Sequence, residues 1–413
     1  MSSMVKRVLV VGGGFGGVAG ALELAKRRDP RLDVMLITNK PHFEYTPMLY
    51  RVVTGRSPLE VCVPLTEIFR DRPVEVVVDE LISFDPSLRT AQGMSGRRYD
   101  YDYAVLALGS ETAYFNLPGL AEFSFGFKSI KEALRLEQHI HQLFSQCLDE
   151  KLETELKVCL LHLVIVGAGP SGVELAGELA GYLKQLSRHY KVAHDLVTID
   201  LFEGAPRVLP SLPPAVSGLA AQRLRRLGVN IFLNRALVKE EAEQIVVKGL
   251  STKTKTVIWT AGVKPNSFYQ KISGLTLDQR GRVVVDEHLR AQKFSDLFII
   301  GDGAATTFTG MAQTAGHNGR AAAANVILSA AKQPLKIYHP KKPYYAVPIG
   351  RGWAVTKLGP FVIAGRLGWF VRRLADFRYF LSIFTVGPAI TAFRIGKRLG
   401  HHCPLCAKSD KIS

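Results

Sequence analysis

Short, largely apolar runs alternate with amphipathic stretches along most of this chain. Residues 8–11 and 163–166 contain only apolar side chains, as in parallel strands buried on both faces, and each run leads through glycines into a helical pattern. Further runs of strand length lie at 34–37, 103–108, 197–202, 256–260 and 296–300. Strands that alternate with helices predict an α/β fold with parallel sheets.

The first glycine turn has the spacing G-x-G-x-x-G. Its glycines are Gly12, Gly14 and Gly17, with Phe15 and Gly16 inside the turn. A tight turn, close approach of the backbone to a pyrophosphate and close packing of helix on strand each require a glycine, and the helix N-terminus stabilises phosphate charge. Because a strand precedes the turn and a helix follows it, we predict a dinucleotide site here.

One expected part of this first site is missing. The next strand ends on Thr38 and Asn39, where an Asp or Glu would bind a ribose hydroxyl. A hydroxyl or an amide can still accept a hydrogen bond, so both residues are candidate ligands. Whether Thr38 replaces the carboxylate is left open by the sequence.

The second glycine turn is complete. Gly167, Gly169 and Gly172 repeat the spacing, and the following strand ends on Glu203. A carboxylate there binds ribose hydroxyls and repels a 2′-phosphate, which favours NADH over NADPH. The alternative is a glycine-rich turn that serves packing only. Two dinucleotide sites in one chain imply electron transfer between two cofactors.

Three more turns fit the same scheme. Strands that end at Gly109 and Gly262 are expected to carry the chain between two nucleotide domains. Asp302 follows the run at 296–300, where its carboxylate could bind a ribityl hydroxyl of a flavin or cap a helix. The arrangement of the turns favours the ligand role.

Composition supports a folded protein with an unusual distribution of charge. Hydrophobic residues make up 47% of the chain, which excludes a disordered class, but the formal net charge is +17. From Lys336 onward there are 14 Lys and Arg against two acids, a local excess of +12. Such a region favours nucleic acid or an anionic membrane surface as a partner. The chain starts without an apolar signal core or a transit-type stretch, so neither export nor organelle import is predicted.

The basic region contains a predicted amphipathic helix at 366–381. Its apolar positions follow helical spacing, with Arg366, Arg372, Arg373 and Asp376 on other faces. An apolar, aromatic face flanked by basic residues is typical of a helix that lies in a membrane interface, and the alternative is a last helix packed on the core. The positions on the apolar face are Leu367, Phe370, Val371, Leu374, Phe377 or Arg378, and Leu381. The aromatics of this interfacial stretch are Trp369, Phe370, Phe377, Tyr379, Phe380 and Phe384.

The residues that follow are too short to cross a bilayer. Fifteen uncharged residues lie between Arg378 and Arg394, whereas a spanning helix needs about 20. We expect Gly387-Pro388 to separate two interfacial helices, with Arg394, Lys397 and Arg398 at the lipid headgroups.

Cysteines argue against disulfide chemistry. Cys62, Cys147 and Cys159 stand alone in the sequence, no redox pair follows either glycine turn, and a reducing compartment is expected. Cys403 and Cys406 form a C-x-x-C beside two histidines, which is zinc-ligand spacing without a second pair. Acylation is a further alternative there. We predict a loose, reduced tail and no metal site.

These motifs together resemble the two-dinucleotide flavoproteins and, among them, the type II NADH:quinone oxidoreductases. The resemblance implies an α/β fold with a discontinuous FAD domain at 1–125 and 276–335, an NAD(H) domain inserted at 126–275 behind a helical linker, and a membrane-docking region at 336–413. It rests on VGGGFGG (11–17), PHFEYTPMLYRVVTG (41–55), LALGSETAYFNLPG (106–119), VGAGPSGVELAGEL (166–179), WTAGVKPN (259–266), IGDGA (300–304) and AQTAGHNG (312–319).

The resemblance also implies cofactors and catalytic residues. The first glycine turn would hold FAD, Asp302 would reach its ribityl chain, and the second turn would hold NADH. Glu174 matches a glutamate near the nicotinamide–flavin contact, and the alternative is an ordinary first-turn acid favoured by the helix dipole. Ala312-Gln313 matches a motif near the flavin and the quinone head, and the alternative for Gln313 is a satisfied buried amide. Where the family commonly has a second glutamine, this chain has His317, which could donate a proton to reduced quinone or only pack.

Two classes of function follow. The first is an NADH:quinone oxidoreductase that does not pump protons, lies on the cytoplasmic face of the cell membrane through its basic region, and resembles proteins that form homodimers. The second is a basic flavoprotein resembling apoptosis-inducing factor, with a nucleic-acid or protein partner. Because the basic residues flank apolar aromatics, the membrane is favoured and no nucleic-acid partner is expected.

Overall fold

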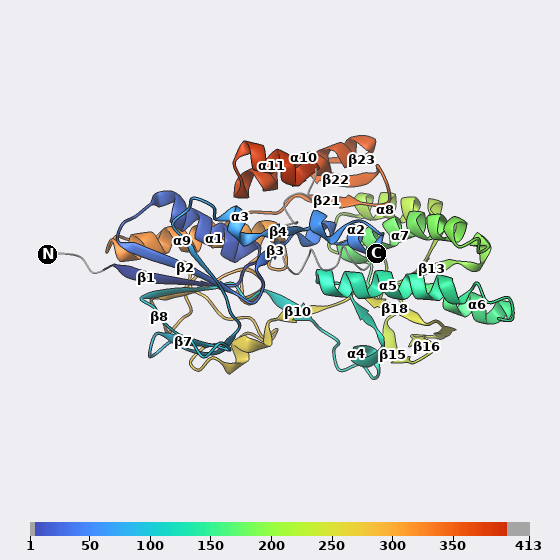
Figure 1. Ribbon diagram of the computed structural model, residues 1–413, viewed down its shortest axis with the longest axis horizontal. Helices are drawn as coiled ribbons and strands as arrows, with labels where there is room; N and C mark the ends of the chain where they lie inside the picture. Colours follow the sequence, from blue (N-terminus) through green and yellow to red (C-terminus); the bar gives the residue numbers. More distant parts are fainter. Residues whose placement is uncertain (1–4, 395–413) are drawn as a thin grey trace.

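The computed structural model describes residues 5–394. Two α/β units lie side by side, and a C-terminal unit lies across both (Figure 1). The expectations for Lys397, Arg398, Cys403 and Cys406 fall outside the described residues. The predicted fold class, α/β with two Rossmann-like units and a separate C-terminal segment, is confirmed for the described part of the chain.

The first unit is built on a five-stranded parallel sheet in the order β20-β9-β1-β2-β5. Helices α1 and α9 pack on one face of the sheet, and a small antiparallel sheet, β6-β7-β8, contributes to the core on the other. Both faces are therefore covered, which explains why these strands are continuously apolar. The bounds are β1 Lys6–Val11, α1 Phe15–Arg27, β2 Leu32–Thr38, β5 Glu75–Val78, β6 Leu81–Asp85, β7 Thr90–Gly93, β8 Arg98–Asp100, β9 Tyr103–Leu106, β20 Leu297–Ile299 and α9 Ala312–Ala330.

The second unit repeats the plan with another five-stranded parallel sheet, in the order β11-β18-β12-β13-β14. Its helices pack on one face, and the antiparallel sheet β15-β16-β17 packs on the other. The bounds are β11 Phe125–Gly126, α5 Ile130–Gln146, α6 Thr154–Leu160, β12 His162–Val166, α7 Pro170–His189, β13 Thr198–Phe202, α8 Pro214–Arg226, β14 Val229–Phe232, β15 Leu237–Glu241, β16 Gln244–Val247, β17 Leu250–Lys253 and β18 Thr256–Trp259.

An antiparallel ribbon joins the two units. Strands β10 (Ser110–Thr112) and β19 (Val263–Pro265) pair with each other just after Gly109 and Gly262, where the sequence predicted crossings between domains. Shorter elements complete the two units. They are β3 His42–Glu44, α2 Tyr50–Val53, β4 Cys62–Pro64, α3 Leu65–Ile68 and α4 Leu120–Phe123.

The C-terminal unit is a three-stranded antiparallel sheet followed by two helices. Strands β21 (Tyr345–Pro348), β22 (Ala354–Leu358) and β23 (Phe361–Gly365) lead into α10 (Arg366–Ile383), and α11 (Val386–Arg394) follows. Among the helices of residues 5–394, none combines the length and the apolar character that crossing a bilayer requires.

Two details of the sequence analysis were wrong. The break between the C-terminal helices falls at Phe384 and Thr385, ahead of Gly387-Pro388. Gly387 and Pro388 lie in the first turn of α11, where proline is tolerated because it loses no backbone hydrogen bond. Cys147 and Cys159 are free thiols, but Cys62 is disulfide-bonded. Spacing along the chain cannot show which cysteines the fold brings together.

Candidate functional site

The first glycine turn forms an open cradle at the N-terminus of α1. Gly12 has a φ of +110°, and a Cβ there would lie 2.3 Å from the carbonyl oxygen of Ala107. Gly14, by contrast, faces open space and is the N-cap of α1, with no side chain capping it and no acid in the first turn. Free N–H groups and room for a ligand thus meet at Gly14, as pyrophosphate binding requires.

The remaining residues of the turn bring helices together. A Cβ on Gly17 would lie 1.8 Å from the carbonyl oxygen of Gly12, and a Cβ on Gly16 would lie 3.3 Å from the carbonyl oxygen of Ala315 in α9. Phe15, the first residue of α1, packs edge-on against Phe43 with ring centroids 4.8 Å apart. The turn therefore requires glycines for packing as well as for a ligand.

The second glycine turn has the same construction. Gly167 has a φ of +104°, and a Cβ on Gly172 would lie 1.9 Å from the carbonyl oxygen of Gly167. Gly169 faces open space as the uncapped N-cap of α7, and Pro170 begins the helix. Gly262, at the neighbouring strand end, lies against the ring of Phe115.

At the end of the strand that follows each glycine turn, one side chain contacts the turn, and this side chain differs between the two units. The Glu203 carboxylate accepts hydrogen bonds from the backbone N–H of Ala168 in the second turn, at 2.7 Å, and of Ala205, at 2.9 Å. Thr38 is buried, and its Oγ1 would lie 2.7 Å from a Cβ on Gly13 of the first turn. Thr38 thus occupies the corresponding position with a neutral hydroxyl, whereas Asn39 is exposed.

Asp302 points to the ribbon and not into a helix cap. It lies in a short 3-10 turn, Gly301–Gly303, just after β20, and the next long helix, α9, begins only at Ala312 with Met311 as its N-cap. The Ser110 hydroxyl donates to Oδ2 of Asp302, and the backbone at Gly109 is in the left-handed region with open space beside it. Of the two alternatives for Asp302, the ligand role fits this arrangement.

Gln313 and His317 hold a segment of backbone against α9. Gln313 is exposed, and its amide bonds both backbone groups of Tyr344, donating to the carbonyl at 2.9 Å and accepting from the N–H at 3.1 Å. One turn further, Nε2 of His317 lies 3.0 Å from the carbonyl oxygen of His339. Burial lowers the pKa of His317, so the ring is neutral near pH 7. Ala312, half-buried, begins the helix.

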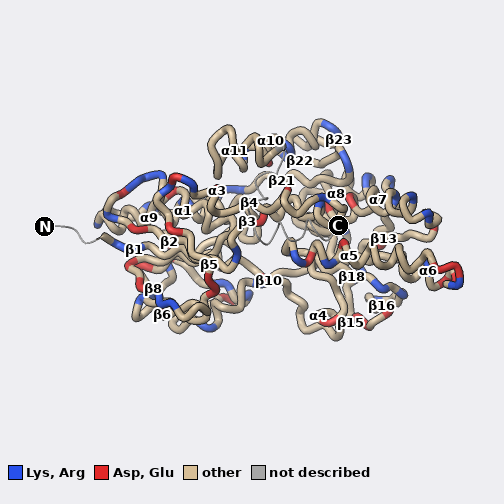
Figure 2. Tube along the Cα trace, viewed as in Figure 1, with Lys and Arg blue, Asp and Glu red and all other residues tan. Residues whose placement is uncertain are grey.

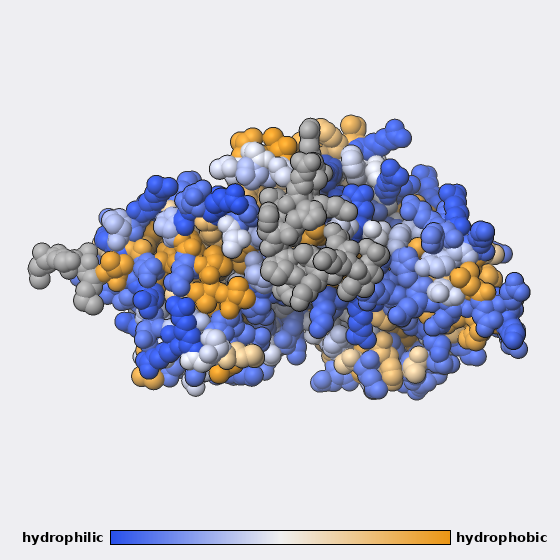
Figure 3. All heavy atoms as spheres, in the orientation of Figure 1, coloured by the Kyte–Doolittle hydropathy of each residue, from blue (hydrophilic) through white to orange (hydrophobic). Residues whose placement is uncertain are grey.

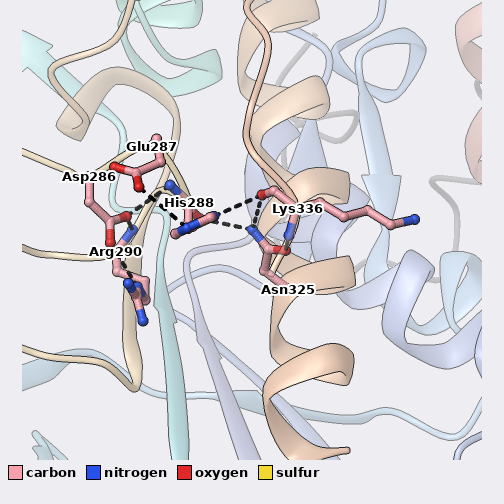
Figure 4. A network of polar contacts seen from close by, with 6 residues as sticks. All are labelled: Asp286, Glu287, His288, Arg290, Asn325 and Lys336. Carbon is pink, nitrogen blue, oxygen red and sulfur yellow. Dashed lines mark hydrogen bonds and ion pairs between the residues drawn. The ribbon is translucent and has the colours of Figure 1, made fainter. Parts of the chain in front are cut away.

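The same backbone segment, residues 331–344, is tied down further along α9 (Figure 4). Asn325 donates to the carbonyl oxygen of Lys336 at 2.9 Å and accepts from its N–H at 2.9 Å. His288, from the loop before β20, also bonds that carbonyl, at 3.0 Å. Gln313, His317 and Asn325 therefore line one face of α9 and fix the chain that leads to the C-terminal unit.

A buried cluster of charges joins the second unit to α10. Glu174 in α7 has a side chain 13% exposed, with Oε1 4.0 Å from Nη1 of Arg372. Burial raises the pKa of Glu174 to about 8, against the opposing effect of the Arg372 charge. Nε of Arg372 lies 3.1 Å from Asp376, and its other nitrogens donate to the carbonyl oxygens of Ala346 and Pro47, at 2.7 and 2.8 Å.

Glu174 lies in the second turn of α7, and no acid stands in the first turn. Stabilisation by the helix dipole falls off within the first turn, so the position does not support that role. A buried carboxyl that is largely protonated at neutral pH, held beside a fixed guanidinium, is the pattern of a functional acid.

Aromatic residues connect this cluster to the first glycine turn. Tyr45 donates to Asp376 at 2.7 Å, and its ring stacks on Tyr379 of α10 with centroids 5.1 Å apart. Tyr379 also contacts Phe15 and Phe43, at 5.2 and 5.8 Å. Among residues 5–394, the buried hydroxyl of Tyr379 has no hydrogen-bond partner, although a buried hydroxyl normally has one. Sequence reasoning had grouped Tyr379 with the interfacial aromatics; only its neighbours in space reveal the site.

Helix α10 buries part of its charge and exposes much of its apolar surface. Arg372 and Asp376 lie beneath the helix and Arg366 and Arg378 are exposed, whereas the rest of the outer face is apolar and extends onto α11 (Figure 3). Along these two helices the charges are concentrated on α10, which carries four arginines and Asp376, whereas α11 carries only Arg394 (Figure 2). Soluble helices normally show the reverse arrangement. The exposed apolar residues are Leu367, Trp369, Phe370, Leu374, Leu381, Val386 and Ile390.

Comparison with known proteins agrees with this arrangement. A family model described as pyridine nucleotide-disulphide oxidoreductase matches residues 6–323. The chain is 31% identical over 405 residues to the type II NADH:quinone oxidoreductase Ndh of Mycobacterium tuberculosis, covering 92% of this chain and 85% of that protein. It is 27% identical over 407 residues to the type II NADH:quinone oxidoreductase of Staphylococcus saprophyticus, covering 95% and 98%. A structure of NDH2 from Plasmodium falciparum in complex with NADH has the same fold, with a TM-score of 0.84 at 18% identity over 96% and 98% of the two chains.

Proposed function

Because this chain belongs to the type II NADH:quinone oxidoreductases, within the pyridine nucleotide-disulphide oxidoreductase family, we propose that it oxidises NADH through bound FAD and reduces a membrane quinone. FAD supplies the redox chemistry, accepting a pair of electrons from NADH and releasing them to the quinone. The observation that carries the proposal is the buried cluster of Glu174, Arg372 and Tyr379, which lies where both glycine-turn units meet the apolar helix.

We assign the cofactors to the two units by the shape of their turns. The open cradle at Gly14 and its uncapped helix fit the pyrophosphate of FAD, with Thr38, Gly109 and Asp302 along the rest of the cofactor. The cradle at Gly169 and the Glu203 carboxylate fit NADH.

The proposed FAD domain comprises 1–125 and 276–335, the NAD(H) domain 126–275, and the docking region 336–413. Strand β20 returns to the first sheet, which supports a discontinuous FAD domain. Strand β11 crosses the proposed boundary at 125, because Phe125 and Gly126 both pair with β18 of the second sheet.

We propose that Glu174 holds a proton beside the cofactors and that Arg372 fixes its position. A raised pKa keeps the carboxyl protonated near neutral pH, where a proton is needed to form quinol. Gln313 lies at the start of α9, and we place it at the acceptor end of the site through its hold on Tyr344. The hydrogen bond and lowered pKa of His317 support packing over proton donation.

We further propose that the apolar outer face of α10 and α11 docks on an anionic membrane at the cytoplasmic face, where NADH is available. A helix with an apolar side facing away from the protein and exposed Arg366 and Arg378 along its length suits the lipid interface. A nucleic-acid groove would instead expose charges between the aromatics. The homodimer rests on the resemblance alone, and analytical ultracentrifugation in detergent would measure it.

The purified protein tests the proposal directly. We expect a yellow protein with a flavin absorption spectrum, which oxidises NADH when a water-soluble quinone is added. Absence of flavin from protein made in flavin-sufficient cells, or no NADH oxidation with any quinone analogue, would reject it. Co-sedimentation with anionic vesicles and with DNA, in parallel, separates the membrane function from the nucleic-acid alternative.

A further inference from the structure

Lys128 is fixed at the start of the second unit by a helix cap. It lies between β11 and α5, next to the N-cap residue Ser129. The Ser129 hydroxyl accepts from the N–H of Glu132 at 3.2 Å, and the Glu132 carboxylate accepts from the N–H of Lys128 at 2.8 Å. These bonds resemble a capping box, except that Glu132 reaches the residue before the N-cap, and they fix the backbone from which the Lys128 side chain extends.

The side chain of Lys128 reaches out of its own unit to the ribbon. Its Nζ donates to the Ser110 hydroxyl at 2.7 Å, and that hydroxyl in turn donates to Oδ2 of Asp302. A chain of polar contacts thus runs from the second unit, through the ribbon, to the acid at the end of β20 in the first unit. No other function described above uses Lys128.

The position is costly for a lysine. Burial lowers the pKa of the Lys128 ammonium, and the charges of Asp302 and Glu132 act in the opposite direction. A half-buried ammonium that bonds a hydroxyl, and not a carboxylate directly, gains less from pairing than a salt bridge would. An effect of Lys128 on the orientation and charge of Asp302 explains this placement better.

We propose that Lys128 is a positioning residue for FAD, an inference that rests on the proposed function. Through Ser110 it holds one oxygen of Asp302, so that the other is directed at the ribityl chain. Its positive charge also offsets the negative charge of Asp302 beside the cofactor, which favours the more electron-rich, reduced state of the flavin. Lys128 therefore raises both the affinity for FAD and its reduction potential.

The test compares three variants of the holoenzyme with the unaltered protein. Lys128→Met removes the charge and the bond, Lys128→Arg keeps the charge, and Ser110→Ala removes the relay but keeps the charge. The matched control is Lys131→Met, which removes an exposed charge three residues away. The measurements are release of FAD on dilution, followed by flavin fluorescence, and the midpoint potential of the bound flavin.

We expect Lys128→Met to weaken FAD retention about tenfold, as for loss of a charge-assisted hydrogen bond, and to shift the potential to a more negative value. Lys128→Arg should restore most of the potential, and Ser110→Ala should weaken retention with a smaller shift in potential. Circular dichroism confirms folding of each variant.

The proposal is overturned if Lys128→Met retains FAD like the unaltered protein at the same potential, or if Lys131→Met shifts both quantities equally. Failure of the unaltered protein to bind FAD would reject the proposed function instead, so the two failures are distinguishable.

Discussion

The outer face of α10 should control membrane binding. Leu367, Phe370 and Leu374 are 72%, 56% and 51% exposed, and all three point away from the protein. Taking about 2 kcal/mol for full burial of each side chain, inserting these exposed fractions into lipid contributes about 3 to 4 kcal/mol. Substituting all three with serine should therefore weaken partitioning into vesicles by a factor of about 100 or more.

The assay is co-sedimentation of the triple variant with vesicles that contain anionic lipid, at fixed protein and increasing lipid. A matched control substitutes serine for Ile82, Leu88 and Met94, which are 51%, 71% and 67% exposed on the first unit. We expect the control to sediment like the unaltered protein. NADH oxidation with a water-soluble quinone should persist in both variants, because the substituted side chains face away from the buried cluster.

The reasoning is refuted if the α10 variant still sediments with vesicles, or if the control variant loses binding to the same extent. The first result would mean that another surface docks, and the second that exposed apolar area of any location drives association.

Three further predictions concern single side chains of the site. Burial raises the pKa of Glu174 in the folded state to about 8. The protonated carboxyl therefore favours the folded state fully below the unfolded pKa, and this contribution is lost as pH rises toward 8. Glu174→Gln should flatten the resulting fall of the melting temperature between about pH 5 and 8, measured by thermal unfolding. We expect the unpaired Tyr379 hydroxyl to bond the quinone when it binds; Tyr379→Phe keeps the aromatic stack and removes that hydroxyl, so kcat/KM for quinone should fall about tenfold with KM for NADH unchanged, and an equal change in both would contradict this role. Glu203→Gln should lower kcat/KM for NADH about tenfold and raise activity with NADPH, which steady-state kinetics with both nucleotides would check.

The nucleotide cradles could be predicted from sequence because their parts are consecutive. Gly12 and Gly14 act within one strand, turn and helix, and the same holds for Gly167 and Gly169, so local spacing carries the geometry. Thr38 was identified as the weak point of the first cradle for the same reason, and the structure places its hydroxyl against that turn.

Roles that depend on distant partners could not be predicted in this way. His317 was considered as a proton donor, but its bond to His339 depends on a backbone segment that folds back along α9. The arrangement of the turns was enough to favour a ligand role for Asp302, but its link to Ser110 spans 192 positions of the chain and could not be predicted.

The helical spacing of residues 366–381 determined that this segment has one apolar face and one charged face. It could not determine which face meets the protein, because helical periodicity is unchanged when the helix rotates about its axis. The tertiary structure decided it: Tyr45, which is 331 residues from Asp376, and Glu174 on α7 pair with the charged face. Burying those charges against their partners leaves an apolar face outward, and this is the face that we propose docks on lipid.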